Sequence, residues 1–160
     1  ARLSGLHAAA FVHCGDNQIV IVYRGMQIRD IRQYFTVAIR RLLDAPVLAL
    51  RFAELVLERF PNSNVLLVGH SGGGGMAVYT GWALNLPTIA FNPVRPRYDD
   101  GVDGGPLSIN VIVRGDTLSD PTAEGHAAPP GRTLWLDPGD TPWRELHGLE
   151  TVLRSLNGLL

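Results

Sequence analysis

A serine with glycines around it stands where an apolar run passes into a glycine-rich stretch. Residues 69–73 read GHSGG, which fits the pattern G-x-S-x-G. Between a strand and a helix, this pentapeptide forms a sharp turn that lifts the serine hydroxyl clear of the sheet. At the start of the helix, unpaired N–H groups and the helix dipole stabilise negative charge. Ser71 is therefore the candidate nucleophile for acyl chemistry.

Three other interpretations of these glycines compete with a nucleophile turn. A P-loop requires Lys and then Ser or Thr after its last glycine, but Gly75 and Met76 stand there, so this motif fails. A dinucleotide fingerprint fits loosely over residues 72–77. It requires an acid at the end of the next strand, where the chain reads FN at residues 91–92. The third alternative is a tight strand-to-helix turn without chemistry.

A nucleophilic serine needs a base to take its proton and an acid to hold that base. In hydrolases with this turn, the acid and then the histidine follow the serine in the chain. Asp116 follows an apolar run by two residues, Arg114 and Gly115, which places it at the carboxyl edge of a sheet. Asp120 lies deeper in the same loop. Asp116 is the preferred acid, and Asp120 is the alternative.

Two of the five histidines follow Ser71. His126 lies in a loop of small residues, whereas His147 lies between the sequence WREL and an amphipathic stretch whose apolar residues can hold the ring. His147 is therefore the preferred base. The histidines show no metal-ligand spacing, and the single cysteine excludes a multi-cysteine site. The sequence thus predicts a site with neither metal nor cofactor.

The tetrahedral intermediate of acyl transfer needs at least two N–H donors aimed at its oxygen. The first expected donor is the backbone N–H of Gly72, which follows the nucleophile. The second is expected after the apolar run at residues 18–23, where Gly25 permits a turn that points the N–H of Met26 inward. A simple strand exit is the equal alternative at this place.

Short apolar segments predict the elements that must position these residues. Gly and Asn residues punctuate the segments, and residues 15–17 fit a hairpin turn between the first two. The run before the nucleophile is apolar throughout, as expected for a strand buried on both faces. The six predicted strands are Ala8–His13, Gln18–Tyr23, Val65–Val68, Thr88–Phe91, Ile109–Val113 and Arg132–Leu136.

Helical periodicity lies between the strands, at Pro46–Phe60, at Gly73–Leu84 and from about Pro142 to the C-terminus, with a weaker pattern at Asp30–Leu43. Strands that alternate with helices indicate an α/β fold. We expect a mostly parallel sheet with helices on both faces, an antiparallel N-terminal hairpin, and one hydrolase-like domain over residues 1–160. Ligands of such sheets bind beyond the carboxyl ends of the strands.

Composition narrows the class of protein further. The 160 residues are 46% hydrophobic and 18% charged, with a formal net charge of −1, which gives no electrostatic case for binding nucleic acid or an anionic membrane. No apolar run approaches the roughly 18 residues of a membrane span. No signal-like segment opens the sequence, and a soluble protein is expected, either cytoplasmic or secreted. The oligomeric state stays open.

Taken in order, these segments resemble the class 3, or fungal-type, lipases of the α/β-hydrolase superfamily. That family has a strand ending in FRGT or FRGS, an amphipathic helix and a strand ending in GHSLGG. Further similarities are to its T-F-G-x-P-R-V stretch, its N-x-x-D-x-V acid segment and its final histidine. The corresponding segments read IVIVYRGM at 19–26, VLLVGHSGGG at 65–74, IAFNPVR at 89–95, VRGDTL at 113–118 and LHGLE at 146–150.

The resemblance implies a serine hydrolase that cleaves lipid or other acyl esters through an acyl-enzyme. It assigns nucleophile, acid and base to Ser71, Asp116 and His147, and the oxyanion role to Met26. Met26 stands where the family has Thr or Ser, Gly72 stands where it has Leu, and Gln27–Leu43 occupies the place of the lid. An inactive binding or scaffold domain, and an acyltransferase or thioesterase with the same triad, are the alternatives.

Overall fold

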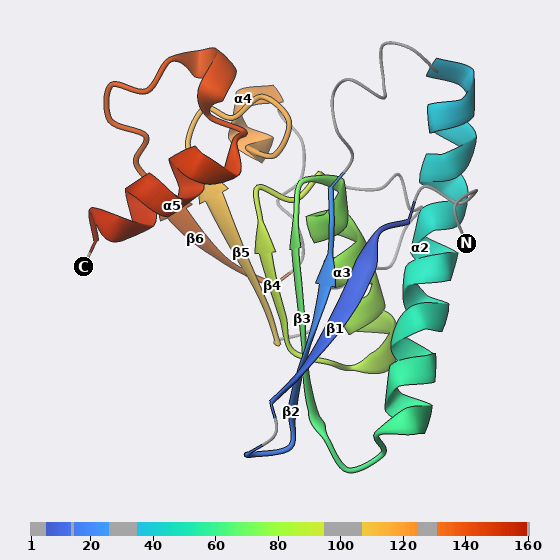
Figure 1. Ribbon diagram of the computed structural model, residues 1–160. Helices are drawn as coiled ribbons and strands as arrows, with labels where there is room; N and C mark the ends of the chain where they lie inside the picture. The colour runs from blue at the N-terminus through green and yellow to red at the C-terminus, as the bar shows by residue number, and fades with distance from the viewer. Residues whose placement is uncertain (1–5, 14, 26–34, 95–106, 125–130, 160) are drawn as a thin grey trace.

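The sheet has six strands, and their order along the sheet is their order in the chain (Figure 1). The computed structural model describes residues 6–13, 15–25, 35–94, 107–124 and 131–159. The first two strands pair antiparallel, and every later neighbour pair is parallel. The predicted fold class is thereby confirmed. The strands are β1 Ala8–His13, β2 Gln18–Tyr23, β3 Asn64–His70, β4 Thr88–Phe91, β5 Ser108–Val113 and β6 Arg132–Leu136.

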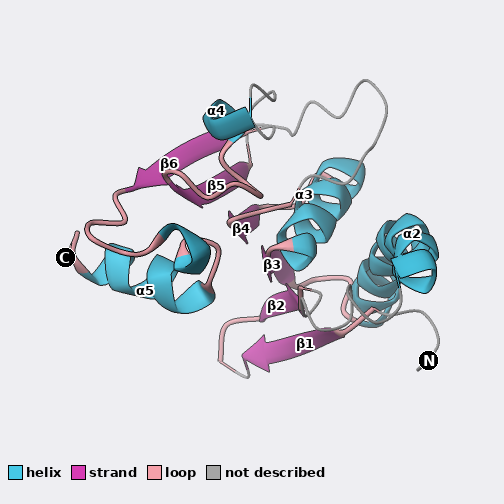
Figure 2. Ribbon diagram, turned by 90° about the horizontal axis from the view of Figure 1, so that it is seen from above, coloured by secondary structure: helices cyan, strands magenta, loops and turns pink. Residues whose placement is uncertain are grey.

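Helices cover both faces of this sheet, as the alternating pattern predicts. Figure 2 shows α2 and α3 on one side and α5 on the other. None of the described helices is both long enough and apolar enough to cross a membrane. The helices are α2 Phe35–Arg59, α3 Gly72–Leu84, the one-turn α4 Pro121–Glu124, the 3₁₀ turn η1 Trp143–Glu145 and α5 Leu149–Asn157.

Two predicted helix boundaries are wrong. The sequence indicates separate helices at Asp30–Leu43 and Pro46–Phe60, but α2 runs continuously from residue 35 to 59 with Pro46 inside it. Proline removes one helical N–H donor, which disfavours a helix interior. Here Ala45, Ala49 and Ala53, on both sides of the proline, are buried against the sheet. Burial of this face outweighs the local preference.

The second error lies after residue 142, where one helix was expected to run to the C-terminus. The structure has η1, then a break at residues 146–148, then α5, which ends at Asn157. Leu146 is 6% exposed and packs in the core with Val152 of α5. The Gly148 N–H turns back to the carbonyl of Glu145 at 3.0 Å. The break therefore leaves His147 in a short loop rather than on a helix face.

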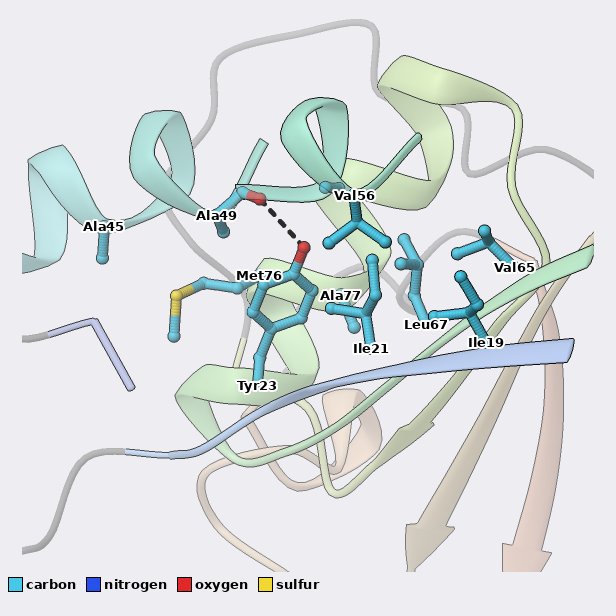
Figure 3. Packing of buried hydrophobic residues seen from close by; sticks show 11 residues of the cluster. Ile19, Ile21, Tyr23, Ala45, Ala49, Val56, Val65, Leu67, Met76 and Ala77 are labelled. Carbon is cyan, nitrogen blue, oxygen red and sulfur yellow. Dashed lines mark hydrogen bonds between the residues drawn. The ribbon is translucent and has the colours of Figure 1, made fainter. Parts of the chain in front are cut away.

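Apolar side chains fill both interfaces of the sheet. The larger cluster lies under α2 and α3 (Figure 3), and a smaller one under α5 joins Val111, Val113 and Leu136. In the larger cluster the Tyr23 hydroxyl donates to the carbonyl of Ala49 at 2.9 Å. Burial raises the pKa of Tyr23 to about 12. The two clusters pack the helices against the strands, and the candidate site lies at the carboxyl ends of these strands.

Candidate active site

Ser71 occupies a strained junction between β3 and α3. Its backbone has φ 58° and ψ −129°, a combination outside the three regions that L-residues ordinarily occupy. The other non-glycine residues with positive φ among those described are asparagines. Such a conformation costs on the order of 1–3 kcal/mol and persists only where the surroundings impose it. The serine is therefore held in place by its neighbours.

Those neighbours are glycines because the chain leaves no room for a side chain. A Cβ at Gly69 would lie 2.1 Å from the carbonyl oxygen of Gly73, and one at Gly73 would lie 2.1 Å from that of Tyr23. A Cβ at Gly25 would come within 3.0 Å of the Ser71 Cβ. The start of α3 is thus pressed against β2 and β3, and the chain that leaves β2 passes beside Ser71.

The structure brings Ser71, His147 and Asp116 together. The Ser71 Oγ lies 2.7 Å from Nε2 of His147, and Nδ1 of the same ring lies 2.7 Å from Oδ2 of Asp116. The three residues follow β3, β6 and β5, whose parallel register puts their carboxyl ends at one edge of the sheet (Figure 1). This arrangement permits proton transfer from the hydroxyl to an imidazole that a carboxylate orients.

Asp116 is only 2% exposed, and donors surround its carboxylate. Oδ1 accepts from the Leu118 N–H at 3.1 Å, and Oδ2 accepts from the hydroxyl of Ser119 as well as from the imidazole. Hydrogen bonds to the charged form stabilise a buried carboxylate. Both carboxylate oxygens of Asp116 are thus held by hydrogen bonds, and Oδ2 faces His147.

Asp120, the alternative acid, holds the turn that carries Asp116. Its Oδ2 accepts from the Gly115 N–H at 2.7 Å, and its Oδ1 accepts from both the N–H and the hydroxyl of Thr122, at 2.8 and 2.6 Å. Gly115 itself has φ 79°. These bonds hold the loop after β5. Asp120 therefore closes the turn, whereas Asp116, the preferred acid, contacts His147.

Two polar residues that the sequence patterns did not single out contact the loop of His147. The Nε2–H of His70 donates to the carbonyl of His147 at 2.8 Å, and Nδ2 of Asn92 donates to the carbonyl of Leu146 at 3.0 Å. Burial lowers the pKa of His70, and the nearby His147 ring lowers it further, against the opposing effects of its hydrogen bond and of Asp116. For Asn92, the signal in the sequence is an asparagine directly after a predicted buried strand.

The remaining predicted residues divide between described and undescribed parts of the chain. Gly72 is the first residue of α3, so its N–H has no acceptor within the helix. Met26 and His126 lie outside the described residues, as do residues 27–34 of the expected lid, while residues 35–43 begin α2. Within the described ranges no group of three or more His, Cys, Asp or Glu could hold a metal ion.

Comparison with sequence families assigns the chain to a family. Residues 4–89, more than half of the chain, match the family described as Mbeg1-like. The chain belongs to the Mbeg1-like family. No curated protein matches this Mbeg1-like chain in sequence. The family match begins before β1, ends within β4 and includes Ser71, whereas Asp116 and His147 follow it.

Solved structures share the fold of this Mbeg1-like chain. The Lip2 lipase of Yarrowia lipolytica has 16% identity and a TM-score of 0.55, over 84% of this chain and 62% of that one. The native lipase of Rhizomucor miehei in its propeptide complex has 18% identity and a TM-score of 0.57, over 84% and 53%. YahD with malic acid has 10% identity and a TM-score of 0.58, over 96% and 98%.

These structures confirm the lipase-like α/β-hydrolase fold that the resemblance predicted. The Mbeg1-like chain spans little more than half the length of the fungal lipases, 62% and 53% of the two compared. YahD, by contrast, is matched over nearly its whole length. The fold is therefore also found in a chain of similar size.

Proposed function

We propose that the protein is a serine hydrolase that cleaves carboxylic esters through an acyl-enzyme. The observation that carries this proposal is the imidazole of His147, which lies 2.7 Å from both the Ser71 hydroxyl and the Asp116 carboxylate. The strained conformation of Ser71 adds support, because backbone strain clusters at functional sites. The lipase-like fold agrees with this chemistry.

The chemistry follows from these contacts. Nδ1–H of His147 donates to Asp116, which leaves Nε2 free to take the proton as Ser71 Oγ attacks the ester carbonyl carbon. The carbonyl oxygen gains the negative charge of a tetrahedral intermediate. Nε2–H then gives its proton to the departing alcohol as the C–O bond breaks. Water, deprotonated by the same nitrogen, releases the acid and restores the hydroxyl.

The oxyanion is assigned to the backbone N–H groups of Gly72 and Met26. Gly72 begins α3, and the free N–H groups and the dipole at the N-terminus of a helix favour an anion. For Met26 the support is that Gly25, the residue before it, approaches Ser71 closely. Since Met26 carries no hydroxyl, its contribution is limited to its backbone donor.

The substrate class we propose is a lipid ester or another acyl ester. The support is the fold shared with lipases from Yarrowia and Rhizomucor. Simple p-nitrophenyl esters of two to eight carbons are suitable first substrates, because the released phenolate reports turnover whatever natural alcohol the site accepts. A primary alcohol added as competing acceptor separates hydrolysis from acyl transfer, since a transferase forms the new ester in preference to the acid.

The test compares two serine variants. Ser71→Ala is expected to lower kcat for p-nitrophenyl butyrate by at least about 10³-fold, since loss of the nucleophile removes the covalent path. Ser155→Ala, on α5, is the matched control and is expected to retain wild-type turnover. Circular dichroism establishes that both variants are folded. Wild-type turnover that survives in Ser71→Ala would reject the assignment, and a folded wild type without turnover would favour the scaffold alternative.

A further inference from the structure

The loop that carries His147 is held at two consecutive carbonyl groups. Asn92 Nδ2 donates to the carbonyl of Leu146 at 3.0 Å, and His70 Nε2 donates to the carbonyl of His147 at 2.8 Å. The two donors come from the ends of β4 and β3, and the acceptors follow η1. The backbone that carries the imidazole is thus tied to the strands beside the nucleophile.

Asn92 is fully buried and uses both ends of its amide. Its Oδ1 accepts from the N–H of Val113 at 2.9 Å, while its Nδ2 serves Leu146. Its backbone N–H donates to Val111 at 2.8 Å. A buried site that needs one donor and one acceptor on the same planar group fits an amide and neither a carboxylate nor an apolar side chain. Asn92 therefore links β5, which leads to Asp116, with the loop of His147.

The segment around Asn92 also holds the nucleophile. The N–H of Ser71 donates to the carbonyl of Phe91 at 3.0 Å, and the N–H of Val94 donates to the carbonyl of Ser71 at 3.0 Å. Residues 91–94 thus contact Ser71 through backbone groups and the base loop through Asn92. This stretch of chain therefore contributes to the relative position of the Ser71 hydroxyl and the His147 imidazole.

His70 holds the other side of the loop. Its ring centroid lies 5.2 Å from that of His147, at an interplanar angle of 38°. Its partner is a carbonyl, which only accepts, so Nε2 must carry the proton. The lowered pKa of His70 keeps the ring neutral near pH 7, and a neutral neighbour does not repel the imidazolium that forms on His147 during turnover.

We propose that His70 and Asn92 are positioning residues, which fix the backbone at residues 146–147 so that one imidazole reaches both Ser71 and Asp116. The inference rests on the proposed hydrolase function. Neither side chain transfers a proton or contacts the reacting ester. Their effect is geometric, and a displacement of about 1 Å in a catalytic group can cost about 10²-fold in rate.

Kinetics of three histidine variants test this role. His70→Phe keeps a ring beside His147 but removes the donor, and kcat is expected to fall about 10- to 100-fold with KM within about 2-fold of wild type. His70→Gln supplies an amide N–H in place of Nε2–H and is expected to recover most of the loss. His13→Gln, at an exposed histidine of β1, is the matched control with unchanged kinetics.

Asn92→Asp tests the second contact independently. It keeps an acceptor for the Val113 N–H but replaces the donor to Leu146 with a second acceptor. The same pattern, a lower kcat with little change in KM, is expected. If Asn92→Asp fails to fold, the His70 variants decide the proposal. The side chain of His70 is only partly buried, so its substitution is expected to leave the fold intact.

Hydrogen exchange separates failure of this inference from failure of the proposed function, because it needs no turnover. In His70→Phe, peptides covering residues 143–152 are expected to exchange at least about 10-fold faster, while peptides from β3 keep wild-type protection. A folded His70→Phe with wild-type kcat and unchanged exchange at 143–152 would overturn the positioning role. An inactive wild type with faster exchange in the variant would reject only the hydrolase function.

Discussion

Among single residues, the two carboxylates after β5, Asp116 and Asp120, have different roles because they have different hydrogen-bond partners. Asp116 accepts from the imidazole, from the Leu118 N–H and from the Ser119 hydroxyl. Asp120 accepts from Gly115 and Thr122 and closes the turn. One carboxylate orients the candidate base, and the other orients the loop that presents the first.

This division predicts different consequences for the two amide substitutions. Asp116→Asn preserves shape but presents a donor to Nδ1–H, so the imidazole adopts the wrong tautomer, and kcat is expected to fall by roughly 10³- to 10⁴-fold. Asp120→Asn is expected to lower the midpoint of urea unfolding while keeping more of the activity. Steady-state kinetics and urea titrations on both variants check this. Equal losses of kcat would contradict it.

At the scale of elements, the packing of α3 against β2 and β3 decides where the serine can sit. The Cβ atoms missing at Gly69 and Gly73 would overlap backbone atoms rather than movable side chains. Overlap with backbone cannot be relieved by a rotamer change, so the helix itself must move. The nucleophile turn therefore depends on contacts between elements as much as on its own five residues.

Alanine at Gly73 is expected to be strongly destabilising, by about 3 kcal/mol or more, because its Cβ would overlap the Tyr23 carbonyl. Gly158→Ala is the matched control, since a Cβ there meets the Ser155 oxygen at 3.6 Å and the backbone is right-handed. Chemical denaturation of both variants measures the difference. A Gly73→Ala protein as stable as Gly158→Ala would contradict the close approach.

The strands were predictable because continuous apolar runs bounded by turn residues persist in the sheet almost residue for residue. The helix ends were less predictable, since Pro46 and Leu146 follow tertiary burial rather than local preference. Ser71, Asp116 and His147 could be nominated from motif and chain order. His70 and Asn92 could not, because their partners lie 77 and 54 residues away, and no local pattern records such a contact.

For the molecule as a whole, the buried hydroxyl of Tyr23 makes the stability of the main core depend on pH. The sequence contains no lysine, and its positive charge comes from 14 arginines, which do not titrate below about pH 12. Tyr23 joins β2 to α2 through its bond to the Ala49 carbonyl. Its pKa, raised to about 12 from 10.0, means that the neutral form is favoured in the folded state.

The folded protein is therefore expected to lose stability between about pH 10 and pH 12. The contribution of Tyr23 is fully present below the unfolded pKa of 10.0 and is lost as the pH rises toward about 12. The loss is on the order of 2 kcal/mol. Tyr23→Phe lacks the hydrogen bond at neutral pH but is expected to show a flatter decline. Urea titrations at pH 8, 10 and 11.5 compare the slopes, and identical slopes would contradict the assignment.

The whole fold also places the candidate site at the carboxyl edge of the sheet, from which the chain turns back along opposite faces. After β3 it returns as α3, and after β6 it passes through η1 to α5 on the other side (Figure 2). Ser71 stands at the first exit and His147 at the second. β4 and β5 separate β3 from β6 in the sheet. The two residues meet because the loop after η1 returns to the ends of β3 and β4, where His70 and Asn92 bind it.

Covalent labelling with a fluorophosphonate probe, followed by mass spectrometry of the peptides, tests most directly whether Ser71 is an activated nucleophile. An activated serine attacks the phosphorus and expels fluoride, so we expect a single adduct on Ser71 and at least roughly 10²-fold slower labelling in His147→Ala. A folded wild-type protein that stays unlabelled, or that is labelled on another serine with Ser71 unmodified, would contradict this expectation.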